Sequence, residues 1–383
     1  MHNSFYPFMF LFIISCTSYN PEQIKSGETI PQDAIANHAN ILLEDPMISS
    51  LSIGIAYNGK QYIKHFGELD KGQNNTPTNR TIYEIASVTK TLLAFLISQA
   101  ELEGKLSLDD DVRKYLDGDY DNLQYDGKPI LIRHLLTHTS SLPARIPGLS
   151  ELFTDIDAQL PNRVHEVESK YSKERFFKDL IEFELNTMPG TNFSYSGPGA
   201  ELATYIIEKV YDQSFDQIIE EKIGSKIQIP DTKIHLNEEQ LARLANGYGM
   251  DGNKTIHMES NLWGGSGSGK STPADLMNYI QFLLDNKNKA ALNTFTKLFD
   301  AEFIYGDKNN KIGFYWIMNE EDDFGKSASH HGGAFGMQNW LHIYPESKLG
   351  LSIITNQSGM DTSSKLVGLQ QDILQELRKA NGK

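Results

Sequence analysis

The sequence predicts an α/β fold in which one antiparallel sheet of about five strands is built from both ends of the chain and flanked by helices. Three observations lead to this prediction. A helical pattern and two strand-like runs lie near the start, three strand-like runs and a helical pattern lie near the end, and a long, mostly helical stretch lies between them. At 383 residues the chain has the length of one large domain or two smaller ones. We expect one fold with a helical insertion.

The N-terminal part of the sheet is predicted from a helix followed by a hairpin. Residues Gln32–Leu43 place apolar side chains at helical spacing, and residues 51–57 alternate between apolar and small side chains. Asn58-Gly59 follows, and a second strand-like run spans Gln61–Phe66. Asn-Gly is a preferred pair for a type I′ turn, because both central residues of that turn need a positive φ.

The middle of the chain is predicted to be mostly helical. We expect residues 87–304 to form this helical part, while residues 31–86 and 305–380 form the α/β part. Apolar side chains at helical spacing mark the following stretches: Leu92–Ala100, Phe176–Phe183, Glu201–Val210, Phe215–Ile223 and Ala274–Leu284.

The C-terminal strands are predicted at Ile312–Met318, Trp340–Tyr344 and Leu349–Thr355. The last two flank Pro345-Glu346-Ser347-Lys348 and predict a second hairpin. Helical periodicity over Leu366–Leu377 closes the chain.

Composition excludes several classes of function. The chain has 35 Lys and Arg against 50 Asp and Glu, which gives a net charge of −15 and makes nucleic acid an unlikely partner. A single cysteine excludes intramolecular disulfides and zinc sites built from several thiolates. The mean hydropathy is negative, which argues against a protein with many membrane spans.

The N-terminus has the features of an export signal. The apolar run Phe5–Ile14 is about ten residues long, too short to span a bilayer but typical of a signal peptide. It ends in Ile13-Ile14-Ser15-Cys16, which resembles the lipobox of bacterial lipoproteins, although no Lys or Arg precedes the run. The resemblance implies a signal peptide over 1–15, a lipid on Cys16 and a tether over 16–30. The alternative is an ordinary signal sequence with an incidental cysteine.

This resemblance also implies a location. We expect a bacterial lipoprotein that contacts the membrane through its lipid anchor only and faces the periplasm or the cell surface. Because Thr17 follows Cys16 where an Asp often marks inner-membrane retention, the outer membrane is favoured.

The first chemical motif is Ala86-Ser87-Val88-Thr89-Lys90-Thr91, at the start of an apolar helix. Its spacing puts Ser87 and Lys90 on one helical face. The positive potential of a helix N-terminus favours an alkoxide at Ser87. Alone the motif is weak, because a capping serine with a solvated lysine gives the same pattern.

Two more motifs follow along the chain. Tyr195 lies in a loop before a helix, within Pro189–Gly197, and a tyrosine close to a Ser/Lys pair can act as a general base. His330-His331-Gly332-Gly333-Ala334 precedes the last hairpin, and its glycines allow a ligand to approach the backbone closely.

The three motifs, in this order, resemble the serine β-lactamase and penicillin-binding-protein superfamily, in its branch of class C β-lactamases, D,D-peptidases and esterases. Gly104–Asp110 also resembles this branch, and Ile132–Ser140 resembles its "RHLLTHTSG" segment with Ser141 in place of Gly. The resemblance covers roughly residues 32–380 and implies a β-lactamase/transpeptidase-like fold.

The resemblance implies a role for each motif residue. Ser87 would be the nucleophile that forms an acyl-enzyme. Lys90 would take part in transferring the Ser87 proton, and Tyr195 would act as general base and acid. The backbone N–H groups of Ser87 and Ala334 would form the oxyanion hole. No metal and no cofactor are implied.

Substrate binding is assigned in the same way to His331, Gly333, Ala334 and Gly197. His331 takes the third-motif position, where it could bond Tyr195 or a substrate carboxylate. Two departures matter: Gly197 stands where relatives carry Asn, and His331 stands where β-lactamases favour Lys. A mostly neutral imidazole holds a β-lactam carboxylate less well than an ammonium does.

These departures favour a D-amino-acid peptidase, similar to a D,D-carboxypeptidase, or an esterase. The alternatives are a class C-like β-lactamase and a non-catalytic penicillin-binding or scaffold lipoprotein. The substrate would be a small peptide, an ester or a β-lactam-like molecule.

Three other patterns are weaker. Gly264–Ser271 matches the Walker A motif, but no buried strand precedes it, so we expect a loop ending in a helix N-cap and no bound nucleotide. His134 and His138 have zinc-ligand spacing without a third ligand, and we expect structural histidines. Three tryptophans could line a pocket but are more often core residues: Trp263, Trp316 and Trp340.

Overall fold

The computed structural model describes residues 29–285, 287–296, 302–305 and 308–382. The predicted signal peptide, Cys16 and all but the end of the predicted tether lie outside the described residues. Lipidation and location therefore stay predictions. Within the described ranges, no helix combines the length and the apolar character needed to cross a membrane.

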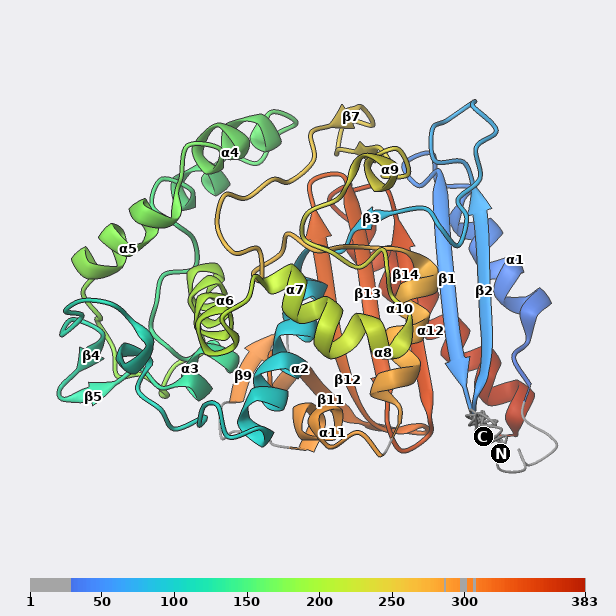
Figure 1. Cartoon of the computed structure of the whole chain (residues 1–383). Helices are drawn as coiled ribbons and strands as arrows, with labels where there is room; N and C mark the ends of the chain where they lie inside the picture. Colours follow the sequence, from blue (N-terminus) through green and yellow to red (C-terminus); the bar gives the residue numbers. More distant parts are fainter. Residues whose placement is uncertain (1–28, 286, 297–301, 306–307, 383) are drawn as a thin grey trace, which may run out of the picture.

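A sheet of eight strands organises the fold, in the order β2-β1-β14-β13-β12-β11-β10-β9. Every pairing in it is antiparallel. Figure 1 shows the blue strands from the start of the chain beside the red strands from its end. From the start of the chain, the strands are β1 (Ser50–Tyr57), β2 (Lys60–Gly67), β9 (Glu302–Tyr305), β10 (Lys308–Ile312), β11 (Ile317–Asp322), β12 (Gly325–Ala334), β13 (Met337–Tyr344) and β14 (Leu349–Thr355).

The two ends of the chain meet where β1 pairs with β14, with Ile53 opposite Ile353. This confirms the prediction of an antiparallel sheet built from both ends. The β1–β2 turn is confirmed as well, because Asn58 and Gly59 both have positive φ, 46° and 78°.

The sheet has eight strands where about five were expected, because one predicted strand is divided into two and because β9 and β12 were not predicted. The predicted strand Ile312–Met318 is wrong: β10 ends at Ile312, residues 313–316 turn, and β11 begins at Ile317. The turn contains three aromatic residues that are buried in the core: Phe314, Tyr315 and Trp316. The apolar run that predicted a strand here therefore reflects burial of the turn and not a strand. Strand β12 was missed because its sequence is rich in Gly, Ser and His.

Helices cover both faces of the sheet. On one face α12 (Thr362–Asn381) packs against β13 and β14, and α1 (Gln32–Leu42) packs against α12 and β2. On the other face α10 (Pro273–Leu283) packs against β1, β2 and β14, and α2 (Thr89–Leu102) belongs to the same core.

The helical part lies beside the sheet and in front of one of its faces, in cyan to orange (Figure 1). Its remaining helices are α3 (Ile132–Leu136), α4 (Leu160–Glu168), α5 (Lys173–Glu182), α6 (Gly197–Tyr211), α7 (Phe215–Ile219), α8 (Ser225–Ile227), α9 (Glu238–Leu241) and α11 (Lys289–Thr296). Four segments have tighter or wider turns: Ala86–Val88, Val112–Tyr115, Ser150–Thr154 and the π-helical Glu220–Gly224. Three two-stranded pairs complete this part: β3 (Tyr83–Glu84) with β8 (Lys270–Ser271), β4 (Gln124–Tyr125) with β5 (Lys128–Pro129), and β6 (Gly247–Tyr248) with β7 (Lys254–Thr255).

The start of α2 is tied to two distant segments. The N–H of Ile85 donates to the carbonyl oxygen of Gly269 at 2.9 Å. A Cβ on Gly332 of β12 would lie 2.2 Å from the carbonyl oxygen of Ile85, so only glycine allows this approach. Sheet, helix and the loop before β8 therefore meet at residues 85–87.

Candidate active site

Ser87 lies in the 3₁₀ turn Ala86–Val88 that leads into α2. The preceding Ala86 has a φ of 45°, a conformation that side-chain-bearing residues rarely adopt. The Thr89 hydroxyl stabilises this turn by donating to the carbonyl oxygen of Ala86 at 2.6 Å. Strained backbone of this kind is concentrated at functional sites.

Residues from two distant motifs meet at the Ser87 hydroxyl. The Tyr195 hydroxyl donates to Ser87 Oγ at 2.9 Å, and Lys90 Nζ donates to the same oxygen at 3.4 Å. Lys90 Nζ also lies 4.8 Å from the centre of the Tyr195 ring. Lys90 is 1% exposed and Tyr195 is 41% exposed, so the lysine is sealed in the core while the tyrosine borders solvent.

His138 packs against the Tyr195 ring. The two ring centres are 4.2 Å apart, and the backbone N–H of Ser196 donates to His138 Nδ1 at 3.1 Å. Burial lowers the pKa of His138 well below its usual value, so the imidazole is neutral. His134, four residues earlier, accepts the backbone N–H of Leu131 at Nδ1, and both histidines thus have structural contacts.

The structure corrects the predicted orientation of His331. Its Nε2 bonds Gln338 Oε1 at 2.6 Å and Ser363 Oγ of α12 at 3.1 Å, and its ring packs on Trp340. Strand side chains alternate between the two faces, so the neighbouring His330 lies on the opposite face of β12.

His330 faces the start of α2, as Gly332 on the same face of β12 does. It is fully buried, and burial together with the charge of Lys90 lowers its pKa to about 3. The sequence predicted His331 at the third-motif position, whereas the structure places its neighbour His330 near Lys90.

The remaining predicted substrate-binding residues border one cavity with Ser87. Gly197 begins α6, and its N–H donates to the carbonyl oxygen of Ala144 at 3.0 Å. Gly333 and Ala334 end β12. All three line the cavity. Two of the tryptophans, Trp263 and Trp316, are core residues.

The Walker A-like segment is a loop tied to α6. The buried carboxylate of Glu201 accepts the N–H groups of Trp263 and Gly264, both at 2.9 Å, and of Ser266 at 3.0 Å. The N–H groups of Gly264 and Ser266 are therefore bonded to a carboxylate of the protein itself. The predicted N-cap is confirmed at Thr272, whose hydroxyl accepts the N–H of Asp275 at 3.1 Å at the start of α10.

The loop also holds Lys90. The carbonyl oxygen of Ser266 accepts a hydrogen bond from Lys90 Nζ, in addition to the bond that Lys90 gives Ser87. Sequence analysis missed Glu201, although a glutamate within the apolar pattern of α6, beside Ala200 and Leu202, is a signal for a buried charge.

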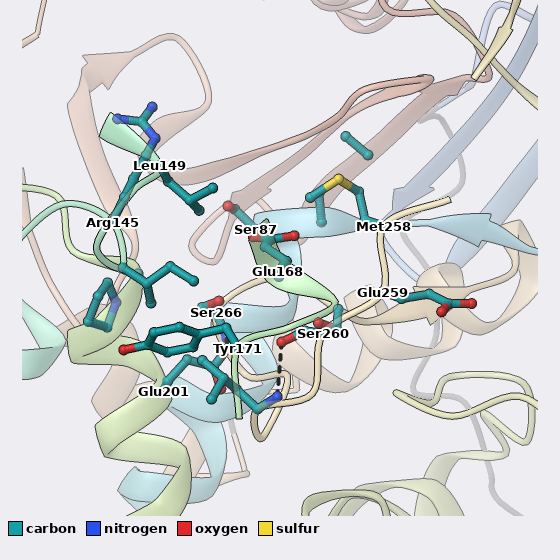
Figure 2. Close-up of a pocket in the computed structure, with 18 of the residues that line it drawn as sticks. Ser87, Arg145, Leu149, Glu168, Tyr171, Glu201, Met258, Glu259, Ser260 and Ser266 are labelled. Carbon is teal, nitrogen blue, oxygen red and sulfur yellow. Dashed lines mark hydrogen bonds between the residues drawn. The ribbon is translucent and has the colours of Figure 1, made fainter. Parts of the chain in front are cut away.

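The cavity in front of Ser87 has a volume of about 200 Å³ and is bordered by charged side chains that sequence analysis missed (Figure 2). Arg145, Glu168 and Glu259 line it together with Tyr171. Burial, helped by the negative charge of Glu201, raises the pKa of Glu168 to about 7. No sequence motif marks these residues, because each reaches the cavity from a separate loop or helix end.

Comparisons with known proteins agree with this architecture. The family model "Beta-lactamase" matches residues 36–372. The "Protein flp" of Staphylococcus aureus (strain MRSA252) is 27% identical over 333 residues, which are 85% of this chain and 62% of that protein. This chain thus spans about three fifths of the length of that relative.

Two further proteins match over nearly their whole length. The D-alanyl-D-alanine-carboxypeptidase/endopeptidase AmpH of Escherichia coli (strain K12) is 23% identical over 379 residues, 95% of this chain and 94% of that protein. The structure of a β-lactamase/D-alanine carboxypeptidase from Yersinia pestis, complexed with citrate, has a TM-score of 0.76 at 21% identity and covers 90% of this chain and 97% of its own.

Proposed function

The chain belongs to the β-lactamase family and is a serine hydrolase of that family, and from this premise we propose that it hydrolyses D-amino-acid peptides or esters through an acyl-enzyme on Ser87. One observation carries the proposal. The Ser87 hydroxyl lies between the Tyr195 hydroxyl, at 2.9 Å, and the Lys90 amine, at 3.4 Å. A nucleophile within hydrogen-bond reach of a base and a cation is the arrangement that covalent hydrolysis requires.

The reaction follows from these contacts. Ser87 Oγ attacks the carbonyl carbon, and the Tyr195 oxygen, which lies 2.9 Å away beside Lys90, accepts its proton. The amine or alcohol leaves with that proton, and an ester to Ser87 remains. Water then gives a proton to Tyr195 and attacks the ester, and Ser87 recovers its proton as the acid is released.

The oxyanion is stabilised by backbone N–H groups in this scheme. One comes from Ser87, at the start of a helix, and the second from the Gly333–Ala334 end of β12, which borders the same cavity. Such a preorganised donor contributes about 3–4 kcal/mol to transition-state stabilisation.

A peptidase or esterase is preferred over a β-lactamase for two reasons. The third-motif residue on the Lys90 face is His330, whose lowered pKa keeps it neutral and unable to supply a cation for a β-lactam carboxylate. Gly197 offers no side chain to a substrate amide. The similarity to AmpH, a D-alanyl-D-alanine-carboxypeptidase/endopeptidase, supports the same choice.

A labelling experiment tests the function. The protein is incubated with a fluorescent penicillin, a phosphonate and a p-nitrophenyl ester, and adducts are located by mass spectrometry. We expect Ser87 to be modified and a D-alanyl-D-alanine peptide to be cleaved. Absence of any Ser87 adduct would contradict the catalytic proposal, and fast nitrocefin turnover lost in Ser87→Ala would instead favour the β-lactamase.

We further propose that the protein is a lipoprotein attached through Cys16, as the sequence Ile13-Ile14-Ser15-Cys16 supports. Metabolic labelling with a lipid probe should be lost in Cys16→Ala. Labelling that persists in the variant would rule out acylation at this residue.

A further inference from the structure

The Lys90 amine contacts a backbone carbonyl, that of Ser266, in addition to Ser87. Its amine donates to Ser87 Oγ at 3.4 Å and to the carbonyl oxygen of Ser266. Both of these hydrogen-bond partners are uncharged oxygens, a hydroxyl and a backbone carbonyl. An ammonium has three N–H donors and is costly to bury unpaired, so the position of the Ser266 carbonyl determines where the Lys90 amine lies.

Ser266 is in turn held by Glu201. This side chain is 2% exposed and accepts three backbone N–H groups, from Trp263, Gly264 and Ser266. Hydrogen bonds to a charged carboxylate are roughly twice as strong as neutral ones. Ser266 donates its N–H to Glu201, and its carbonyl oxygen accepts a hydrogen bond from Lys90. The Glu201 carboxylate therefore fixes the position of Ser266, and Ser266 fixes the position of the Lys90 amine.

The loop cannot hold this position by itself. It is rich in glycine, and glycine adopts many backbone conformations. Its glycines are needed for close packing: a Cβ on Gly265 would lie 1.9 Å from the Thr204 hydroxyl, one helical turn after Glu201 on α6. A Cβ on Gly269 would lie 2.3 Å from the Thr89 hydroxyl. The loop therefore fits between α2 and α6, where the Gly269 N–H donates to the Thr89 hydroxyl at 2.9 Å and Glu201 fixes residues 263–266.

We propose that Glu201 is a positioning residue for the hydrolytic reaction: it holds residues 263–266 so that the Ser266 carbonyl keeps the Lys90 amine against Ser87. The inference rests on the function proposed for Ser87 and Lys90. Glu201 acts through Ser266, whose N–H it accepts and whose carbonyl oxygen contacts Lys90.

The test compares Glu201→Gln with Glu208→Gln. Glu208 lies on the same helix, and its carboxylate also accepts a backbone N–H, from Phe215 at 2.7 Å, but that bond is not connected to Lys90. Hydrolysis of p-nitrophenyl acetate is measured per active site, with sites counted by a phosphonate probe. For Glu201→Gln we expect kcat per site to fall about tenfold or more and KM to stay within about twofold. Glu208→Gln should match the wild type.

A merely structural role predicts a different result. Loss of stability would lower the number of active sites that the probe counts, while kcat per site and the pH–rate profile would stay unchanged, and that result would overturn the proposal. Displacement of the Lys90 amine from Ser87 should instead lower kcat per site and change the pH–rate profile.

A second variant keeps the test decisive if Glu201→Gln does not fold. Gly265→Ala introduces a clash with Thr204 and displaces the loop while leaving every charge in place. It should also lower kcat per site, and an unchanged value would overturn the proposal. A wild-type protein that no probe labels would refute the proposed function itself, and that result appears before any Glu201 variant is compared.

Discussion

The sheet around β1 and β14 and the site around Ser87 are both buried, but different interactions stabilise them. In the sheet, Ile53, Ile55 and Ile353 belong to an apolar cluster with side chains of α1 and α12. In the site, Lys90, Glu201 and His330 are buried polar groups. An apolar contact can be replaced by a neighbouring one, whereas a buried polar group depends on one or two particular partners. Substitutions should therefore change stability in the first region and chemistry in the second.

The largest effect is expected for Ser87→Ala. Loss of the nucleophile should reduce ester hydrolysis by at least about 10⁴-fold. The unfolding free energy should remain close to that of the wild type, because Ser87 lies at the edge of the core. Steady-state kinetics and urea unfolding measure the two quantities, and residual hydrolysis at more than about a tenth of the wild-type rate would contradict the assignment.

Ile53→Ala should give the opposite result. The side chain is 0% exposed, and its truncation should lower the unfolding free energy by about 2–5 kcal/mol through lost burial and a new cavity. Hydrolysis per labelled site should be unchanged. Ile41→Ala is the control, because Ile41 is 54% exposed. Equal stabilities of the two variants would contradict the division between the regions.

Glu168→Gln tests how much the negative charge of Glu168 in the cavity lowers the unfolding free energy. Burial raises the Glu168 pKa from 4.5 to about 7, so the folded protein holds this proton more tightly than the unfolded chain does. This contribution is fully present below pH 4.5 and is lost as the pH rises through about 7. Glu168→Gln does not lose this contribution as the pH rises. Between pH 4 and pH 8 its unfolding free energy should therefore increase, relative to that of the wild type, by up to roughly 3 kcal/mol.

Urea unfolding at several pH values measures this difference. Glu166→Gln is the matched control, because Glu166 lies on the same helix with an exposed side chain paired to Lys170. The control should follow the wild type at every pH. A Glu168 variant that does the same would show that this carboxyl group is not strained by burial.

The smallest effect is expected at the β1–β2 turn. Gly59→Ala forces an alanine to a φ of 78° and should cost about 1 kcal/mol, although a Cβ there would meet no atom within 4 Å. Urea unfolding of this variant separates backbone strain from crowding. A stabilised variant would contradict the assigned turn.

The fold could be predicted wherever local patterns encode it. The Asn58-Gly59 turn, the strands beside it and the apolar faces of α2, α6 and α10 are all visible as periodicities or turn signals. Strand β12 could not be predicted in this way, because its sequence is dictated by the site: glycine is required where Ile85 approaches, and histidine faces Lys90.

Only the site residues that lie in short contiguous motifs could be predicted from the sequence. Ser87, Lys90 and Tyr195 were identified from short motifs, and the structure brings them into contact. The choice between His330 and His331 depends on strand register, which two adjacent histidines leave ambiguous. Glu201 and Glu168 reach the site through tertiary packing, which no local pattern in the sequence records.

The pairing of β1 with β14 has a consequence for the order of folding. The β1–β2 hairpin is synthesised early, but β14, the partner strand of β1, follows only after the long helical part. Until then the hairpin has an open, apolar edge, which is the kind of surface that recruits other strands and aggregates. Contacts this distant in sequence also close slowly. The nascent chain must therefore keep one edge of β1 unpaired until β14 emerges, and truncations that remove β14 should fail by aggregation before any loss of catalytic geometry matters.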